Sequence, residues 1–224
     1  MLSNFIEDLK QSKFYNSIID KHKVILMFIS GSRIIGVTDE RSDYDIIVVV
    51  DDNQEVSTQE YLIYNGVKVH WYYIPLAQFI TANSRESLRC YGKVLFANIR
   101  DDVIIYSNPD YEDVTKLLLD NKNAIAANGA NKTYRTYSNL IRSILEAGAI
   151  LPQHHTKFLS HLCVVSLAIT GEKLTDETRS LLRQLKRIRW QPVSDEAKAW
   201  CVVRLTLLNR IMKMGEVQHA YSIY

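Results

Sequence analysis

Two aspartates one residue apart stand at the start of an apolar run. Asp43 and Asp45 open the stretch DYDIIVVV, whose β-branched residues predict a buried strand. Side chains alternate between the two faces of a strand, so the two carboxylates point to the same side. Two like charges this close need a compensating cation, and hard oxygen ligands suit Mg²⁺ or Mn²⁺. The sequence therefore predicts a metal site at Asp43 and Asp45.

A Gly-Ser pair ends the apolar run that precedes these acids. The stretch VILMFIS (24–30) predicts a buried strand, and Gly31 and Ser32 follow it directly. Glycine permits a close approach of the backbone, and a serine hydroxyl with the N–H groups after it can hold a phosphate. Arg33 or Arg41 can add charge-assisted contacts to phosphate oxygens. Phosphate held on one side and metal on the other is what phosphoryl-group chemistry requires.

Strands and helices alternate in the segments that must position these residues. Residues 3–20 have the apolar spacing of a helix, and Asn65-Gly66 predicts the turn of a hairpin within 61–74. Helix 76–83 would follow, and two strands near KVLFAN (93–98) and VIIYSN (103–108) would complete the sheet. After Pro109 every patterned segment is helical. We therefore predict an α+β domain over residues 1–110 and an all-α helical-bundle domain over 111–224.

The composition of the 224 residues is that of a folded, water-soluble protein, with 47% hydrophobic and 23% charged residues. No apolar run reaches the roughly 20 residues of a membrane helix, and the first residues lack the pattern of a signal peptide. We therefore expect a cytoplasmic protein without membrane contact. From Arg179 onward, nine Lys or Arg residues stand against three acids. Two interpretations of these basic C-terminal helices stay open: they present a solvated face, or they contact RNA.

The motif GSRIIGVTDERSDYDI, with ten residues between Gly-Ser and Asp-Tyr-Asp, resembles the signature of the DNA polymerase β-like nucleotidyltransferase superfamily. It is most similar to small stand-alone members, which include aminoglycoside-modifying, antitoxin-like and phage-encoded enzymes. The resemblance covers about residues 24–106. It implies a nucleotidyltransferase-like mixed β-sheet with flanking helices. It also implies transfer of NMP from an NTP, expected to be ATP, with release of pyrophosphate. The acceptor would be a hydroxyl on a small molecule, an RNA end or a protein.

The resemblance also implies roles for individual residues. Two Mg²⁺ ions would be held by Asp43 and Asp45, which are the expected metal ligands and catalytic residues. The nucleotide would be bound by Gly31 and Ser32. Independently of the resemblance, we expect Arg33, Arg41 and Ser42 beside them to contribute to nucleotide binding.

The superfamily usually has a third carboxylate on a neighbouring strand, and here the matching position falls at or near His70. Three interpretations stay open: His70 is a metal ligand better suited to Mn²⁺ or Zn²⁺, a general base for the acceptor, or a strand residue in a site that has lost a ligand. Asp101 or Asp102 could also reach the site from an adjacent strand. The alternative function is a catalytically impaired protein that binds nucleotide, RNA or a protein partner.

Overall fold

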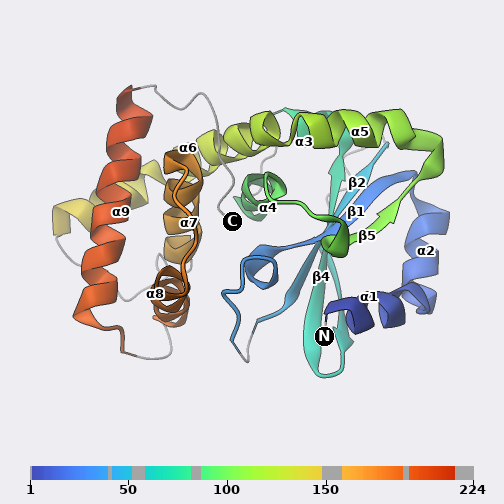
Figure 1. The fold of residues 1–224 in the computed structure, drawn as a ribbon, viewed down its shortest axis with the longest axis horizontal. Coiled ribbons are helices and arrows are strands. Elements are labelled where there is room, and N and C mark those ends of the chain that lie inside the picture. Colours follow the sequence, from blue (N-terminus) through green and yellow to red (C-terminus); the bar gives the residue numbers. More distant parts are fainter. Residues whose placement is uncertain are drawn as a thin grey trace.

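A computed structural model gives the structure of the chain and describes residues 2–39, 42–51, 59–81, 87–147, 158–188 and 192–214. Within these ranges the chain forms one mixed sheet with helices on both faces, followed by a group of helices (Figure 1). This arrangement confirms the predicted α+β architecture with an all-α C-terminal part. None of the described helices is long and apolar enough to cross a membrane. The predicted domain boundary near residue 110 stays a prediction.

The sheet places the two site-bearing strands at its centre. Its order is β3-β4-β2-β1-β5, with the bounds β1 (Val24–Ser30), β2 (Tyr44–Val50), β3 (Gln59–Tyr64), β4 (Val67–Pro75) and β5 (Ile104–Ser107). Strands β2 and β4 run parallel, and the other pairs are antiparallel. Asp45 on β2 lies opposite Ser30 on β1 and opposite His70 on β4. The register therefore brings the predicted site residues into neighbouring positions.

The predicted hairpin between β3 and β4 is present. Asn65 and Gly66 both have positive φ, 46° and 76°, which is the backbone of a tight two-residue hairpin turn. Asparagine tolerates this conformation and glycine adopts it without steric cost. The turn fixes the register in which Tyr61 lies opposite His70.

Two sequence-based expectations for the helices near the sheet are wrong. Residues 3–20 form two helices, α1 (Leu2–Lys10) and α2 (Lys13–Lys21), because the Ser12 hydroxyl accepts from the Tyr15 N–H at 3.1 Å and starts a second helix. The segment KVLFAN, expected as a strand, belongs largely to helix α4 (Ser87–Phe96). Its residues 94–97 are buried all round, and such a run has no periodicity that separates a helix from a strand.

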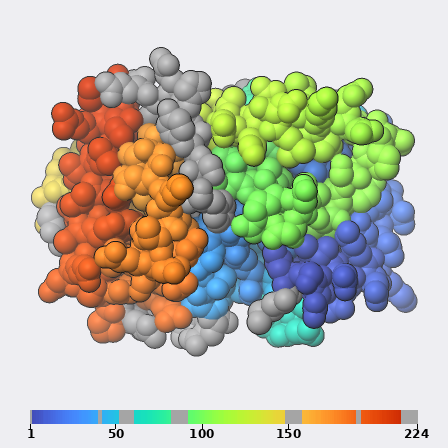
Figure 2. Space-filling model, viewed as in Figure 1, coloured from blue at the N-terminus to red at the C-terminus, as the bar shows by residue number. Residues whose placement is uncertain are grey.

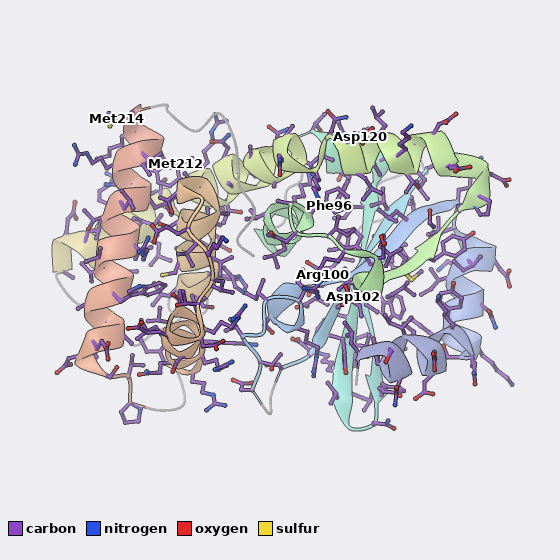
Figure 3. The ribbon with its side chains drawn as sticks, in the orientation of Figure 1. Phe96, Arg100, Asp102, Asp120, Met212 and Met214 are labelled. Carbon is purple, nitrogen blue, oxygen red and sulfur yellow. The ribbon has the colours of Figure 1, made fainter. Side chains whose placement is uncertain are left out.

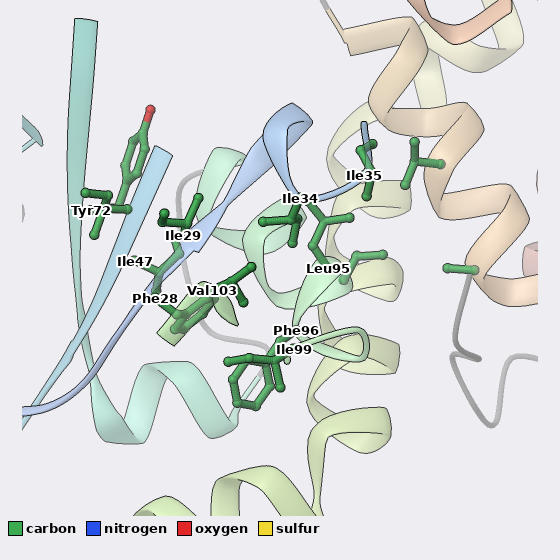
Figure 4. Packing of buried hydrophobic residues seen from close by; sticks show 14 of the residues in the cluster. Phe28, Ile29, Ile34, Ile35, Ile47, Tyr72, Leu95, Phe96, Ile99 and Val103 are labelled. Carbon is green, nitrogen blue, oxygen red and sulfur yellow. The ribbon is translucent and has the colours of Figure 1, made fainter. Parts of the chain in front are cut away.

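Helices cover both faces of the sheet. On one face, the ring of Phe5 from α1 stacks on Tyr44 at 3.7 Å, and Phe14 from α2 packs against Trp71. On the other face, Phe28 of β1 packs against Phe96 of α4, which Figure 4 shows beside Ile99 and Val103. Helix α3 (Leu76–Ile80) covers this second face as well. Because aromatic and aliphatic side chains fill both layers, strand β2 lies in a rigid setting.

The C-terminal part is helical throughout its described residues. Its helices are α5 (Glu112–Asp120), α6 (Lys122–Ala147), α7 (Leu159–Thr170), α8 (Asp176–Arg187) and α9 (Asp195–Met214). Thr175 caps α8, because its hydroxyl accepts from the Thr178 N–H at 3.2 Å. The long helix α6 runs from the sheet half to the other helices, and the Asn128 side chain donates to the Ile80 carbonyl at 3.2 Å (Figure 1).

Candidate active site

Gly31 brings the backbone after β1 directly against Asp45. It begins a single 3-10 turn, Gly31–Arg33, and has a φ of +74°. A Cβ atom built at this position would lie 2.1 Å from Asp45 Oδ2. Both the backbone conformation and the space therefore require glycine. The structure therefore places the Gly-Ser turn in direct contact with one of the two acids.

Asp43 and Asp45 are held by two side chains of strand β4. His70 Nε2 donates to Asp43 Oδ2 at 3.2 Å, and Tyr72 donates a hydrogen bond to the Asp45 side chain. Burial raises the pKa of Asp45, and the neighbouring Asp43 charge raises it further, to about 7. Burial by itself would raise the pKa of Asp43, but the hydrogen bond and charge of His70, a backbone hydrogen bond and the charge of Lys186 together outweigh it and lower that pKa.

This donor set fits a divalent cation that takes most of its ligands from elsewhere. Burial is the main cause of the high pKa of Asp45 and the charge of Asp43 adds to it, so a bound cation would compensate the two carboxylates. In the part of the chain that the structure describes, no group of three His, Cys, Asp or Glu side chains forms a metal-binding cluster. Two carboxylates suit Mg²⁺ or Mn²⁺, which can complete its coordination with water and phosphate oxygens.

Arg33 supports the turn that presents the acids. Its guanidinium donates to the carbonyl oxygens of Ser42, at 2.6 Å, and Asp43, at 3.0 Å. The same group lies 3.7 Å from the centre of the Tyr44 ring, where cation and ring attract each other. In this structure Arg33 therefore fixes the residues that lead into β2. Arg41, the other arginine predicted to bind phosphate, lies outside the described residues.

Lys186 reaches this site from helix α8, far away in the sequence. Its ammonium group donates to the hydroxyls of Ser32 and Ser42, each at 2.9 Å. Burial lowers the pKa of Lys186, while the nearby carboxylates, Asp39 first among them, act in the opposite direction. Two hydroxyls and an ammonium group thus lie beside the paired acids. Sequence reasoning had placed Lys186 only on a solvated or RNA-binding helix face.

Lys186 belongs to the basic face of α8 (Arg179, Arg183, Lys186 and Arg187). The three arginines of this face also contact the segment between β1 and β2. Arg179 Nε donates to the Ile35 carbonyl at 3.2 Å, and an Arg183 nitrogen donates to the Gly36 carbonyl at 2.8 Å. Arg187 Nε pairs with Asp39 Oδ2 at 3.2 Å. Figure 2 shows the orange C-terminal helices against the light-blue residues near β2. RNA contact through this face stays a prediction, and Arg189 lies outside the described residues.

A small cavity lies behind Asp45, and its walls come from both parts of the chain. Its volume is about 20 Å³, and Ser30, Gly31, Asp45, Ile47, Tyr72, Gly92 and His161 line it. This space is close to what one water molecule needs. Among the described residues, the buried Ser30 hydroxyl has no hydrogen-bond partner. His161, on α7, is a second residue at the site that the sequence motif could not indicate.

The turn residues Asp101 and Asp102 do not supply a third carboxylate to the site. Both are exposed, and Asp102 pairs with Arg100 at 2.8 Å. Figure 3 labels Arg100 and Asp102. They border a surface hollow beside α1, together with Leu2 and Ile104. The residue next to Asp45 on the neighbouring strand is His70, as the sequence predicted.

Residues 12–96 match the family model of the nucleotidyltransferase domain. Over these residues, which are less than half of the chain, the sequence is similar to nucleotidyltransferase domains, the class that the site motif also indicates. No curated protein sequence matches the chain. Among solved structures, a nucleotidyltransferase-like protein from Exiguobacterium sibiricum 255-15 is similar over 93% of this chain and 75% of its own, at 16% identity and a TM-score of 0.34. The assignment therefore rests on the domain match and the site motif.

The matched range divides the site into two parts. The nucleotidyltransferase domain contributes the Gly-Ser turn, both acids and His70, all within residues 12–96. Lys186 and His161 come from helices outside that range. The C-terminal helices therefore complete the surroundings of the nucleotidyltransferase motif.

Proposed function

We propose that this protein moves a nucleoside monophosphate from a nucleoside triphosphate, with ATP as the expected donor, to a hydroxyl acceptor. The reaction would release pyrophosphate and depend on Mg²⁺ or Mn²⁺. The observation that carries the proposal is one cluster in which groups that bind anions, Lys186 and Ser32, lie beside a carboxylate pair that binds cations. The nucleotidyltransferase domain supports the same class of reaction.

The transfer forms one bond and breaks one. The acceptor oxygen bonds to the α-phosphorus while the bond from that phosphorus to the bridging oxygen of the β-phosphate breaks. Pyrophosphate leaves with the electron pair, and the acceptor proton passes to solvent or to a nearby base. Because the protein has little covalent chemistry to perform, positioning and charge neutralisation carry the catalysis.

The described side chains divide this work. Lys186 and the hydroxyls of Ser32 and Ser42 would bind phosphate oxygens, which can replace the serines as partners of the ammonium group. Asp43 and Asp45 would hold the divalent cation, which neutralises charge on the phosphates when it is bound. Gly31 keeps the turn close to Asp45, so the two sets of groups act on one substrate.

His70 best fits a positioning role toward Asp43. Its Nε2–H points at Asp43 Oδ2 at 3.2 Å, so this nitrogen carries a proton and is not available as a metal ligand in this arrangement. Glutamine at position 70 can still donate from its amide, whereas alanine cannot. We expect His70→Gln to keep most of the transfer rate and His70→Ala to lose more than tenfold, measured as initial rates under saturating metal.

The direct test is metal-dependent release of pyrophosphate. Asp45→Asn removes one carboxylate charge while keeping the shape of the side chain, and we expect at least about a hundredfold loss of rate. Asp51→Asn is the matched control, since Asp51 lies just past the other end of β2, where it accepts a hydrogen bond from Tyr111. Equal rates for Asp45→Asn and Asp51→Asn would refute the assignment of the site.

A second candidate function is nucleotide binding without turnover. The observation in its favour is that the position beside Asp45 on β4 is His70 rather than a carboxylate. Calorimetry with ATP and Mn²⁺, run beside the pyrophosphate assay, separates the two functions. Binding that requires Asp45, with no pyrophosphate released for any acceptor, would favour the second function.

A further inference from the structure

Beyond the acids, the sheet presents an exposed surface on strands β3 and β4, which we call the β3–β4 platform (Tyr61, Ile63 and Lys68). The Tyr61 and Ile63 side chains are 61% and 62% exposed, unusually high fractions for large apolar residues. The Lys68 ammonium lies 4.1 Å from the centre of the Tyr61 ring. An aromatic ring, an aliphatic side chain and a cation therefore share one open patch.

The strand register places the platform on the same face as the proposed active site. Asp45 pairs with His70, and His70 pairs with Tyr61, so these three side chains form one row across the sheet. Ile63 lies opposite Lys68 in the next row. Because strands are about 4.8 Å apart, Tyr61 lies two strands, or about 10 Å, from Asp45. The platform is continuous with the site through His70.

The order of strands separates the platform from the phosphate-binding groups. Ser32 follows β1, on one side of β2, whereas β4 and β3 lie on the other side. In phosphoryl-group transfer the acceptor oxygen enters roughly in line with, and opposite to, the leaving group. If pyrophosphate leaves near Ser32 and Lys186, the acceptor must arrive over β4. The platform then lies where the acceptor enters.

From this geometry we propose that the β3–β4 platform binds the acceptor and that the acceptor is the 3′ end of a single-stranded nucleic acid. This proposal rests on the proposed function. Bases of single strands stack on exposed aromatic side chains of sheet surfaces, and nearby lysines attract their phosphates. Tyr61 and Ile63 receive the terminal base, and Lys68 pairs with the adjoining phosphate. The terminal hydroxyl then points toward Asp43 and Asp45.

The shape of the surface favours a strand end over a small molecule. Sites for small molecules are usually concave, with volumes of about 300–1,000 Å³. Tyr61 and Ile63, by contrast, lie open to solvent, with about three-fifths of each residue exposed. Tyr61 also borders a hollow of about 450 Å³, but Phe14, His22 and Tyr73 are among its lining residues and the site acids are not. An open platform suits a chain that enters from solvent.

Binding is measured first, since it needs no turnover. A short single-stranded RNA and the DNA of the same sequence, each labelled at the 5′ end, are titrated with the full chain in the presence of Mg²⁺, and fluorescence anisotropy is recorded. We expect Tyr61→Ala to weaken binding about 5- to 100-fold and Tyr61→Phe to preserve it, because stacking needs only the ring. Lys68→Gln should weaken binding and lower the slope of log affinity against log salt by about one. Leu117→Ala is the control, because Leu117 on α5 is 55% exposed and lies outside the platform.

Extension of the 3′ end by a labelled nucleotide is measured next, with pyrophosphate release from the wild type in parallel. Binding and extension of RNA, DNA or both, weakened by Tyr61→Ala but not by Leu117→Ala, support the proposal. Equal binding by wild type and Tyr61→Ala, or equal losses in Tyr61→Ala and Tyr61→Phe, overturn it. Pyrophosphate release with small hydroxyl acceptors but no binding of either strand overturns this proposal alone. Strand binding through Tyr61 without pyrophosphate release from any acceptor overturns the proposed function, and with it the acceptor assignment.

Discussion

Replacing Gly31 by alanine should disable the site while leaving the fold in place. The new Cβ atom would lie 2.1 Å from Asp45 Oδ2, whereas such contacts are essentially never shorter than 3.0 Å. Asp45 or the turn must therefore move by about 1 Å. A displacement of that size in a catalytic site can cost about a hundredfold in rate. Alanine at a φ of +74° adds a backbone penalty of about 1–2 kcal/mol.

Gly66→Ala separates the two effects. Gly66 has nearly the same φ, +76°, but no atom lies within 4 Å of the Cβ that would be added. Both variants should therefore lose about 1–2 kcal/mol of unfolding free energy, because alanine must adopt the left-handed backbone at either position. Only Gly31→Ala should lose transfer activity, by about a hundredfold.

Urea denaturation measures the stability of the two variants, and initial rates of pyrophosphate release at saturating metal measure their activity. If Gly31→Ala were as active as Gly66→Ala, the close contact between the turn and Asp45 would have no role in the reaction. The argument that the Gly-Ser turn and the acids work as one site would then be wrong.

Three further predictions concern Lys186, His70 and an ion pair away from the site. Lys186→Met should weaken binding of a non-hydrolysable ATP analogue about 10- to 100-fold, because a charge-assisted contact is lost. Calorimetry measures this affinity, and an unchanged value would mean that Lys186 does not bind phosphate. His70→Asp should lower the unfolding free energy by about 2 kcal/mol without metal, because a third anion replaces the donor to Asp43. Mn²⁺ should restore the lost stability, since three carboxylates can hold the cation. A loss of stability that Mn²⁺ does not reverse would contradict this prediction. The hydrogen bond from Arg204 is the main reason that the pKa of Glu172 is lowered, so its stabilisation is complete at neutral pH and disappears as the pH falls below 4.5. Glu172→Gln should therefore cost less than about 1 kcal/mol at neutral pH and progressively less as the pH falls below 4.5, measured by urea denaturation.

Local patterns were sufficient to predict the centre of the site. Gly31, Asp43 and Asp45 lie within one short motif between two strands, so the sheet register brings them together once those strands form. The Asn65-Gly66 turn likewise fixed β3 against β4 and placed Tyr61 opposite His70. These features depend on residues close in sequence, where propensity and alternation are informative.

Long-range packing explains what the sequence could not show. The basic face of α8 was visible as a pattern, but its target, more than a hundred residues earlier, depends on how α7, α8 and α9 pack. Lys186 therefore emerged as a site residue only from its distances to Ser32 and Ser42. The helix α4 was mistaken for a strand because it is buried all round over residues 94–96 and lacks an amphipathic signal.

The fate of the phosphates of ATP tests the central claim most directly. ATP labelled at the α-phosphorus or at the γ-phosphorus is incubated with the protein, Mn²⁺ and a single-stranded RNA that has a free 3′ hydroxyl. We predict that the α-label joins the acceptor, that the γ-label leaves as pyrophosphate, and that Asp45→Asn loses both signals. Transfer of the γ-label to the acceptor, or undiminished α-label transfer by Asp45→Asn, would contradict nucleotidyl transfer at this site.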